Sequence, residues 1–263
     1  AWVCRLRMPR RTPTARAAKA APDGYTLVLG HNQTHVINAV TQNLQYDVVK
    51  DFEPVTLVAD TPQWLVARKT LPADDTKSFI AWLKQQDGKA TSGTVGVGGP
   101  ADLAAAFFQK ATATKFQLVP YRGGAPLVQD MLAGQIDFTF GQAANYLGHV
   151  RSGTLKPYAV LAKKRWWAAP EVPTMDEAGV TGLDASFWHG LWAPKGTPKE
   201  IIARLNAAMV ETLADETVKK RMADIGQEGW PVDRQNPAAL AAQQKTEIER
   251  WWPVIRAAGI KSE

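Results

Sequence analysis

The sequence contains a single cysteine, Cys4, and no long apolar run, and each absence excludes a class of protein. One cysteine allows neither a disulfide framework nor a cysteine-based metal site within the chain. No apolar run approaches the ~18–20 residues that a membrane-spanning helix needs. The 263 residues, of which 45% are hydrophobic, suffice for about two globular domains with their own cores.

Acidic residues are missing from the start of the chain, and this accounts for the whole net charge of +6. The first 20 residues contain no acid and these basic residues: Arg5, Arg7, Arg10, Arg11, Arg16 and Lys19. Beyond them basic and acidic residues are equal in number, so the body of the protein is neutral. The basic segment has no interleaved aromatic residues and no recognition helix, and we therefore expect no nucleic-acid partner.

The usual arrangements of catalytic and metal-binding residues are also missing. No G-x-S-x-G nucleophile motif occurs, and Cys4 is poorly placed for catalysis in the basic segment. His31 and His35 are four residues apart, but no third ligand is apparent near them, so we expect no metal ion. Nothing in the sequence pairs a nucleophile with its base.

What the sequence does contain is a glycine-rich loop directly before a helix. Gly93, Gly96, Gly98 and Gly99 precede Pro100, and the apolar residues that follow recur at helical spacing. Proline suits the first helical position, and a helix N-terminus carries unpaired N–H donors and about half a positive charge. The loop can therefore bind an anion. It can equally be a tight connection that its glycines permit.

The same loop matches the dinucleotide fingerprint G-x-G-x-x-A from Gly96 to Ala101. That motif requires an Asp or Glu about 20 residues later to bind the ribose hydroxyls. None lies between Asp102 and Asp130, although Arg122 could instead bind a 2′-phosphate. An NADP-dependent reductase is therefore the alternative function.

A second glycine-rich loop follows in the same strand-loop-helix pattern. Strands are expected at 89–92, 116–121 and 136–140. One helix is expected over 101–111, and another begins in the loop 122–126. If the strands are parallel, both glycine-rich loops lie at the same edge of the sheet.

The flanking parts of the chain predict further elements. Strands are expected at 25–29, 54–57, 63–68, 157–161 and 186–194. Helices are expected after Asp75-Thr76, after a capping box at 197–200, and after Asn236-Pro237. Trp188 and Trp192 alternate on one face of their strand and are expected in the core or a cleft wall.

Several of these segments occur in a recognisable order. They are AAPDGYTLVLG, YDVVKDFEPVTLVADTPQWLV, GVGGPADLAAAFF, VPYRGGAPLVQDMLAGQIDFTF, VRSGTLKPYAVL, EVPTMDEAG and FWHGLWAPKGTPKEIIARLN. In this order they strongly resemble the Bug family, the periplasmic solute-binding receptors of tripartite tricarboxylate transporters. The resemblance runs from about Ala15 to Ile260, which is nearly the whole chain.

The resemblance implies an α/β fold with the two lobes of a type II-like periplasmic binding protein. Each lobe would be a mostly parallel sheet flanked by helices, and the lobes would close on a ligand by a hinge motion. The expected boundaries are a non-matching basic tail at 1–14, a first lobe at 15–89 and 190–263, and a second lobe at 90–189. The crossing segments would lie near 88–92 and 185–190.

The resemblance also implies that the chain is a receptor and not an enzyme, without a cofactor. A small organic carboxylate would bind between the lobes and pass to the membrane subunits of the transporter. The ligand-binding residues carried over from the family are Thr34, His35, Gly96, Val97, Gly98, Gly99, Pro100, Ala101, Gly123, Gly124, Ala125, Gln142 and Asn145. Glycine N–H groups and helix N-termini bind anions without a cationic side chain, which agrees with this assignment. The protein is expected to be periplasmic and monomeric.

Three features depart from the family pattern. The family has a strand and a glycine-rich loop before APDGY that Ala1 to Thr14 do not match, so we expect an incomplete first lobe and weak or absent ligand binding. Asp102 stands where the family often has His, and its charge would repel a nearby carboxylate. Gly141-Gln142 replaces a common Asp-Asn pair, which leaves the identity of the ligand open. The start of the sequence has no apolar segment of a signal peptide and no initiator Met.

Overall fold

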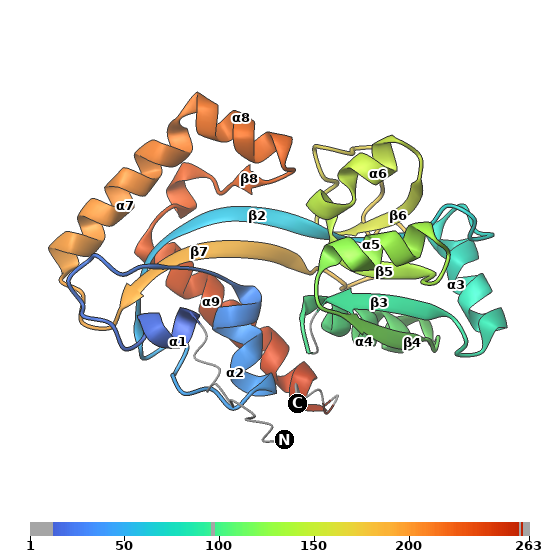
Figure 1. Cartoon of the computed structure of the whole chain (residues 1–263), viewed down its shortest axis with the longest axis horizontal. Helices are drawn as coiled ribbons and strands as arrows, with labels where there is room; N and C mark the ends of the chain where they lie inside the picture. The colour runs from blue at the N-terminus through green and yellow to red at the C-terminus, as the bar shows by residue number, and fades with distance from the viewer. Residues whose placement is uncertain (1–12, 96–97, 258, 260–263) are drawn as a thin grey trace, which may run out of the picture.

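The computed structural model describes residues 13–95, 98–257 and 259 of the chain. They form an α/β protein with two lobes, shown in Figure 1. The strands are β1 Val28–His31, β2 Phe52–Arg68, β3 Thr91–Val95, β4 Gln117–Tyr121, β5 Phe138–Gln142, β6 Leu155–Leu161, β7 Ser186–Pro194 and β8 Glu228–Gly229. The α-helices are α1 Pro13–Ala17, α2 Asn38–Thr41, α3 Thr76–Gln86, α4 Pro100–Thr112, α5 Gly124–Leu132, α6 Leu147–Arg151, α7 Lys199–Ala214, α8 Glu216–Asp224 and α9 Pro237–Ala257. Short helical turns are η1 Gln33–Ile37, η2 Ala143–Asn145 and η3 Val232–Arg234.

Strand β2 belongs to both lobes. Its residues 52–62 pair with β7, and its residues 63–68 pair with β5 and β6. We call the sheet of β1, β7, β8 and the first part of β2 the first lobe. The sheet of β3, β4, β5, β6 and the last part of β2 is the second lobe. In Figure 1, β2 and β7 arch side by side from the first lobe toward the second.

The prolines of β2 explain why the prediction of two separate strands, 54–57 and 63–68, was wrong. Proline has no N–H for the ladder and is tolerated at bulges and at sheet edges. Pro54 lies at a register shift in the pairing with β7. Pro62 is the last residue paired with β7, and Gln63 is the first paired with the second lobe. Both prolines therefore sit where the ladder is interrupted, and the strand continues.

The first lobe differs from the sequence-based expectation. All of its described strand pairs, β1–β7, β2–β7 and β2–β8, are antiparallel, so the prediction of a mostly parallel sheet is wrong for this lobe. Helix α9 packs on one side of the sheet through Leu240, and the partly buried Ile202 of α7 packs against Val55 of β2. Trp188 and Trp192 are buried in the core beside Leu240, which confirms their predicted place.

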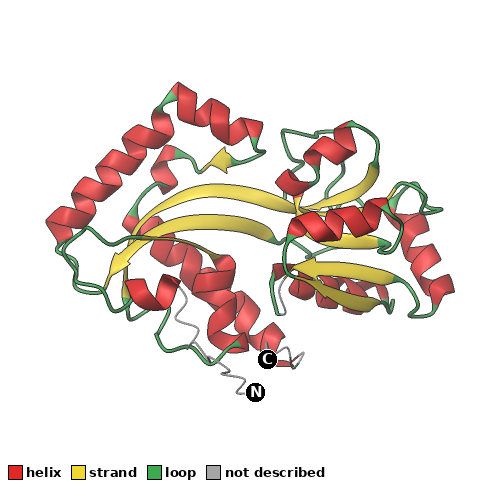
Figure 2. Cartoon of the chain, viewed as in Figure 1, coloured by secondary structure: helices red, strands yellow, loops and turns green. Residues whose placement is uncertain are grey.

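The second lobe contains the parallel unit that the sequence predicts. Strand β3 pairs in parallel with β4 and with β5, and β2 closes the sheet in antiparallel pairs. Figure 2 shows helices on both sides of these strands. Phe108 of α4 and Leu127 of α5 belong to separate clusters, so the two helices cover opposite faces. Helix α3, assigned from sequence to the first lobe, packs against this sheet through Phe79, which contacts Phe138 at a ring distance of 5.0 Å.

Several local predictions can be compared directly with the structure. Strand β7 has the predicted bounds, 186–194. The capping box expected before α7 does not form, because the Thr197 hydroxyl donates to the Pro194 carbonyl at 2.8 Å instead. Helix α3 is capped by Asp75, which accepts from the Ser78 N–H at 2.7 Å. The strand expected at 25–29 begins later, at Val28, after a turn in which Asp23 accepts from the Tyr25 N–H at 3.0 Å.

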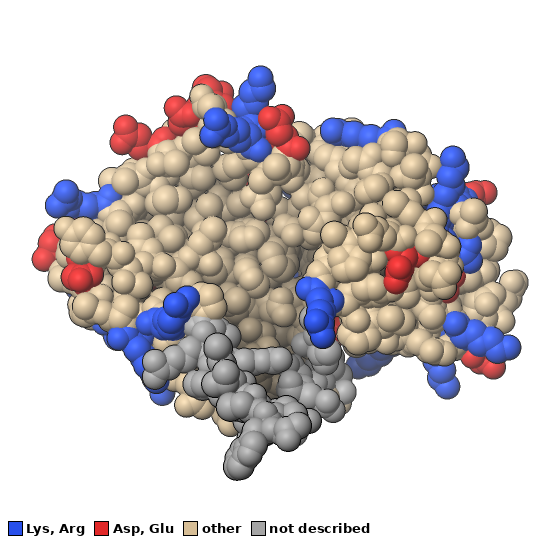
Figure 3. All heavy atoms as spheres, in the orientation of Figure 1, with Lys and Arg blue, Asp and Glu red and all other residues tan. Residues whose placement is uncertain are grey.

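The described surface carries charges of both signs. On the face in Figure 3, basic and acidic side chains lie mostly around the outline and alternate over the upper edge, where α7 and α8 lie in Figure 1. This face therefore has no broad patch of one sign for a nucleic acid. Within residues 13–95 and 98–257, every helix is too short or too polar to cross a bilayer.

Candidate functional site

A cavity of about 150 Å³ lies where the two lobes meet. Its lining residues are Gln33, Gln63, Val95, Pro100, Ala101, Gly124, Thr139, Phe140, Gly141, Gln142, Asn145, Tyr146 and Phe187. Gln33 and Phe187 come from the first lobe, Gln63 lies at the crossing of β2, and the others come from the second lobe. None of these lining residues carries a charged side chain.

Two helix N-termini open onto this cavity. Pro100 and Ala101 begin α4, and Gly124 begins α5. The parallel pairing of β3 with β4 brings both helix starts to one edge of the sheet. Neither N-cap, Gly99 or Gly123, contributes a side-chain hydrogen bond, and Pro100 has no N–H, so the N–H groups left for another acceptor are those of Ala101 and Asp102 in α4 and of Gly124 and Ala125 in α5. The cavity therefore presents partial positive charge without a cationic side chain.

The turn after β5 forms a third wall. Gln142 and Asn145 line the cavity, and the Asn145 amide nitrogen lies 3.7 Å from the Cβ position of Gly124. The ring of Tyr146 occupies the position where a side chain at Gly141 would begin, so a Cβ there would collide with the ring. Burial raises the pKa of Tyr146 to about 12, so its hydroxyl stays protonated and can donate a hydrogen bond.

The side chain of Asp102, in the first turn of α4, bonds to the glycine-rich loop before the helix. This carboxylate is 7% exposed, and its Oδ2 accepts a hydrogen bond from the Gly98 N–H, while Gly98 has a left-handed φ of 73°. Burial raises the pKa of Asp102. The N–H groups of Gly98 and Gly99 therefore interact with this carboxylate of the chain itself, which stands in the first turn of α4.

Thr34 and His35 are not brought to the cavity. The polar segment after β1 forms the turn η1, in which the Thr34 hydroxyl accepts from the His31 N–H at 3.0 Å. His35 is fully buried and stacks on Trp192 at a ring distance of 3.8 Å. Burial and the neighbouring His31 lower the pKa of His35 to about 3, so its ring is neutral. Gln33, the preceding residue, lines the cavity in their place.

The remaining predicted residues divide into groups. The cavity brings together Pro100, Ala101, Gly124, Gln142 and Asn145. Gly98, Gly99, Gly123 and Ala125 lie next to lining residues without lining it, and Ala125 borders an adjoining open hollow of about 540 Å³. Gly96 and Val97 lie outside the described residues.

Sequence reasoning missed several lining residues. They are Gln33, Gln63, Thr139, Tyr146 and Phe187. Thr139 and Tyr146 flank the predicted Gln142 and Asn145 in the chain, whereas Gln33, Gln63 and Phe187 are distant in the chain and join the cavity where β2 and β7 cross between the lobes. One signal was present: Gln63 is a polar residue that opens the apolar run QWLVA, where a buried strand would ordinarily have another apolar residue.

A pair of histidines lies beside the cavity wall. The ring of His31 lies 4.8 Å from Phe187 and 6.0 Å from His189. Burial, with a smaller contribution from His189, lowers the pKa of His31 to about 4. Across the described ranges 13–95 and 98–257, no group of three His, Cys, Asp or Glu residues could hold a metal ion.

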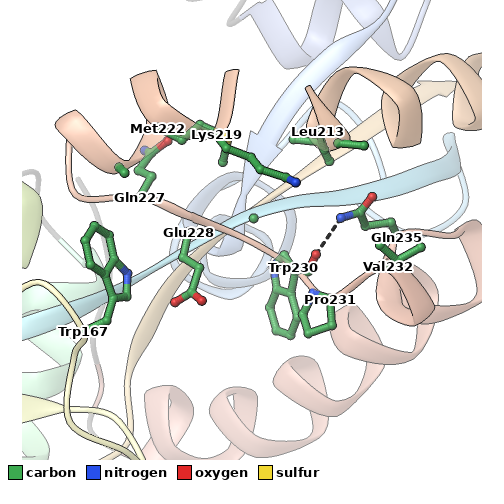
Figure 4. Close-up of a pocket in the computed structure, with 13 residues that line it drawn as sticks. Trp167, Leu213, Lys219, Met222, Gln227, Glu228, Trp230, Pro231, Val232 and Gln235 are labelled. Atoms are coloured by element: carbon green, nitrogen blue, oxygen red, sulfur yellow. Dashed lines mark hydrogen bonds between the residues drawn. The ribbon is translucent and has the colours of Figure 1, made fainter. Parts of the chain in front are cut away.

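A larger hollow of about 420 Å³ lies between α8, β8 and the loop that carries Trp167. Figure 4 shows Trp167 and Trp230 on opposite sides of Glu228, and the Gln235 amide donates to the Trp230 carbonyl at 2.6 Å. No described residue of either glycine-rich loop contributes to its lining. The smaller cavity between the lobes, which both helix starts line, is therefore the candidate functional site.

Comparison with known proteins identifies the family. Residues 11–260 match the family described as "Tripartite tricarboxylate transporter family receptor". The structure of the periplasmic binding protein BugD is similar, with a TM-score of 0.85, 33% identity, and coverage of 95% of this chain and 83% of that chain.

Two similar structures contain carboxylates. MatC of Rhodopseudomonas palustris with bound malate has a TM-score of 0.83 and 34% identity, and the match covers 92% of this chain and 83% of that chain. An R. palustris protein with adipate has a TM-score of 0.85 and 30% identity, with coverage of 94% and 82%. These comparisons confirm the two-lobed fold. With its match over residues 11–260, the chain belongs to the receptor family of the tripartite tricarboxylate transporters, the Bug family, and it is a solute-binding receptor rather than an NADP-dependent reductase.

Proposed function

We propose that this chain is a periplasmic receptor that binds a small organic carboxylate in the cavity between its lobes. It then delivers the solute, as a monomer, to the membrane subunits of a tripartite tricarboxylate transporter. The family and the periplasmic protein BugD support the location and the partner. Malate and adipate in two similar structures support a small organic carboxylate as the solute.

The observation that carries the proposal is an uncharged cavity onto which two helix N-termini open. The starts of α4 and α5 both contribute lining residues, and neither helix has a side-chain cap. Each N-terminus stabilises a nearby anion by roughly 0.3–2 kcal/mol, more where water is excluded. A carboxylate can therefore be held by backbone N–H groups, and no fixed cation is required.

Closure around the solute follows the arrangement of the lobes. Gln33 and Phe187 of the first lobe face the helix starts of the second lobe across the same cavity. We propose that the lobes close by bending of β2 and β7 near Pro62 and Ser186, where the pairing passes from one sheet to the other. Because both lobes contribute to the cavity in the described chain, we expect measurable binding rather than the weak or absent binding predicted above.

Calorimetry tests the proposal with the chain as it stands. The panel comprises C4–C8 dicarboxylates, citrate, hydroxy acids and aromatic acids, and at least one acid is expected to bind. The variant Ala101→Asp puts a negative charge at the start of α4, and we expect it to weaken binding at least tenfold. The matched control Ala111→Asp carries the same charge on the exposed end of α4 and should bind like the wild type. A wild type that binds no acid refutes the proposed function.

A further inference from the structure

The Gln63 side chain is buried at the crossing of β2 with neither of its polar atoms paired. It is 2% exposed, and both Nε2 and Oε1 lack a hydrogen-bond partner among the described residues. A buried polar group without a partner costs roughly 1–3 kcal/mol. The chain therefore retains an unfavourable group at the position where the two sheets meet.

Another buried glutamine of this chain shows how such a side chain is satisfied when it serves the fold. Gln244 of α9 is 6% exposed, and its Nε2 donates to the carbonyls of His35 and Val48, both at 2.9 Å. These hydrogen bonds join α9 to His35 in the turn η1 and to Val48 in the loop before β2. Gln63 makes no comparable bond, so the fold alone does not account for its amide.

The surroundings of Gln63 indicate what its amide faces. It lines the solute cavity together with Gln142, its partner in the β2–β5 register, and with Tyr146. Gln63 also borders a void of only about 10 Å³, together with Asn32 and Ser186. Asn32 already donates to the Ser186 carbonyl at 2.8 Å. A void of this size is at the lower limit for one water molecule, which could satisfy one end of the amide at most. The other end is left for the solute.

We propose that Gln63 determines solute specificity by selecting acids that carry a hydroxyl group on the carbon chain. This inference rests on the proposed function. A carboxamide has a donor end and an acceptor end, and a hydroxyl group can pair with whichever end faces it, because a hydroxyl group both accepts and donates. A methylene group can neither accept nor donate, so it leaves this end of the amide unpaired. The uncharged lining of the cavity contains no cation for a second carboxylate at this place.

The size of the cavity agrees with such a solute. A cavity of about 150 Å³ is enough for a molecule of about six heavy atoms, the size of benzene. A hydroxy acid with a short chain, its carboxylate at the helix starts and its hydroxyl at Gln63, fits this volume. Leaving the amide unpaired against a plain acid costs about 1–3 kcal/mol, which corresponds to a preference of roughly 5- to 150-fold.

Matched pairs of acids test this inference by calorimetry. The pairs are malate and succinate, citrate and tricarballylate, and 3-hydroxybutyrate and butyrate. We expect the wild type to prefer the hydroxy acid at least fivefold in a pair that it binds. Gln63→Met keeps the length of the side chain but removes the amide, and it should reduce the preference to less than twofold by weakening hydroxy-acid binding. Gln85→Met, on the exposed surface of α3, is the matched control and should keep the preference.

Thermal unfolding without solute separates specificity from a structural role. Because Gln63→Met removes an unpaired buried amide, its melting temperature should equal or exceed that of the wild type. If this variant does not fold, Gln63→Leu replaces it. A drop of more than about 5 °C, or a hydroxy-acid preference that survives the substitution, overturns the inference. A wild type that binds acids without preference also overturns it but leaves the proposed function intact, whereas binding of no acid refutes the proposed function itself.

Discussion

Replacing Gly226 with alanine tests whether the lobes must approach each other for a solute to bind. Gly226 lies between α8 and β8 in the first lobe, with a left-handed φ of 69°. A Cβ at this position would lie 2.9 Å from the Trp166 ring and 3.3 Å from the Cα of Ala144, both in the second lobe. Trp166 is 5% exposed and packs edge-on against Trp64 at 5.3 Å, so its ring has little room to move.

The added methyl group has two separate effects. The positive φ costs an alanine roughly 1–2 kcal/mol whether the lobes are open or closed, because it is a local property of the backbone. The collision with Trp166 acts only when the lobes are together, and overpacking of this kind costs roughly 1–3 kcal/mol. The second effect alone weakens solute binding, by roughly 5- to 150-fold, since 1.4 kcal/mol corresponds to a factor of ten.

Gly153 provides a matched control. It lies in the second lobe with a φ of 66°, and no atom lies within 4 Å of its Cβ position. The melting temperature of Gly153→Ala should therefore fall by about 2–8 °C, for a cost of about 1–2 kcal/mol, as the backbone effect alone predicts for Gly226→Ala. Gly153→Ala should bind the solute like the wild type. Calorimetry with the best acid of the panel and thermal unfolding give both quantities for each variant. Equal affinities of the Gly226 and Gly153 variants would refute the closure of the lobes across this contact.

Three further predictions concern charge. The pKa of His35 is lowered to about 3, chiefly by burial and then by His31, so the stability of the folded protein decreases as the pH falls below about 6.5. His35→Phe should flatten this pH dependence of the unfolding free energy, measured in urea between pH 6.5 and 4. If the unfolding free energy of the variant depends on pH as steeply as that of the wild type, the burial of the His35 ring is contradicted. The pKa of Asp60 is raised to about 6, chiefly by burial, so the folded state holds more protons than the unfolded state and stability falls by about 2 kcal/mol as the pH rises from 4 to 6. Asp60→Asn should remove this contribution and gain stability relative to the wild type over that range; a constant difference counts against the shift. Asp102→Asn keeps an acceptor for the Gly98 N–H but removes the negative charge beside the start of α4. Calorimetry should therefore show that this variant binds the solute a few-fold more tightly than the wild type. The exposed control Asp87→Asn should bind the solute like the wild type.

The parallel unit of the second lobe could be predicted because local signals and tertiary structure agree there. Strands β3, β4 and β5 alternate with helices α4 and α5, and glycines and prolines mark the turns between them. Strand β2 could not be predicted as one element, because Pro54 and Pro62 are strong local breakers. Whether a proline interrupts a strand depends on which ladder it faces, and the pairing with β7 is a long-range property.

The candidate site divides in the same way. The starts of α4 and α5 were predictable from glycine and proline chemistry and from the resemblance to the family. Thr34 does not line the cavity, because the turn η1 places Gln33 there and uses the Thr34 hydroxyl within the turn. Gln63 and Phe187 belong to the cavity only through the crossing of two strands more than 100 residues apart in the chain, and the one local signal, the polar Gln63 at the start of an apolar run, does not reveal that crossing.

The shared strand β2 has a consequence for the folding of the protein. Leu57 in its first part belongs to the core of the first lobe, and Trp64 and Leu65 in its last part belong to the cores of the second lobe. Neither sheet can lose β2 while the other keeps it, so the unfolding of one lobe removes a central strand from its neighbour. The two lobes are therefore separate in shape but form one cooperative folding unit, and a destabilising substitution in either lobe lowers the stability of both.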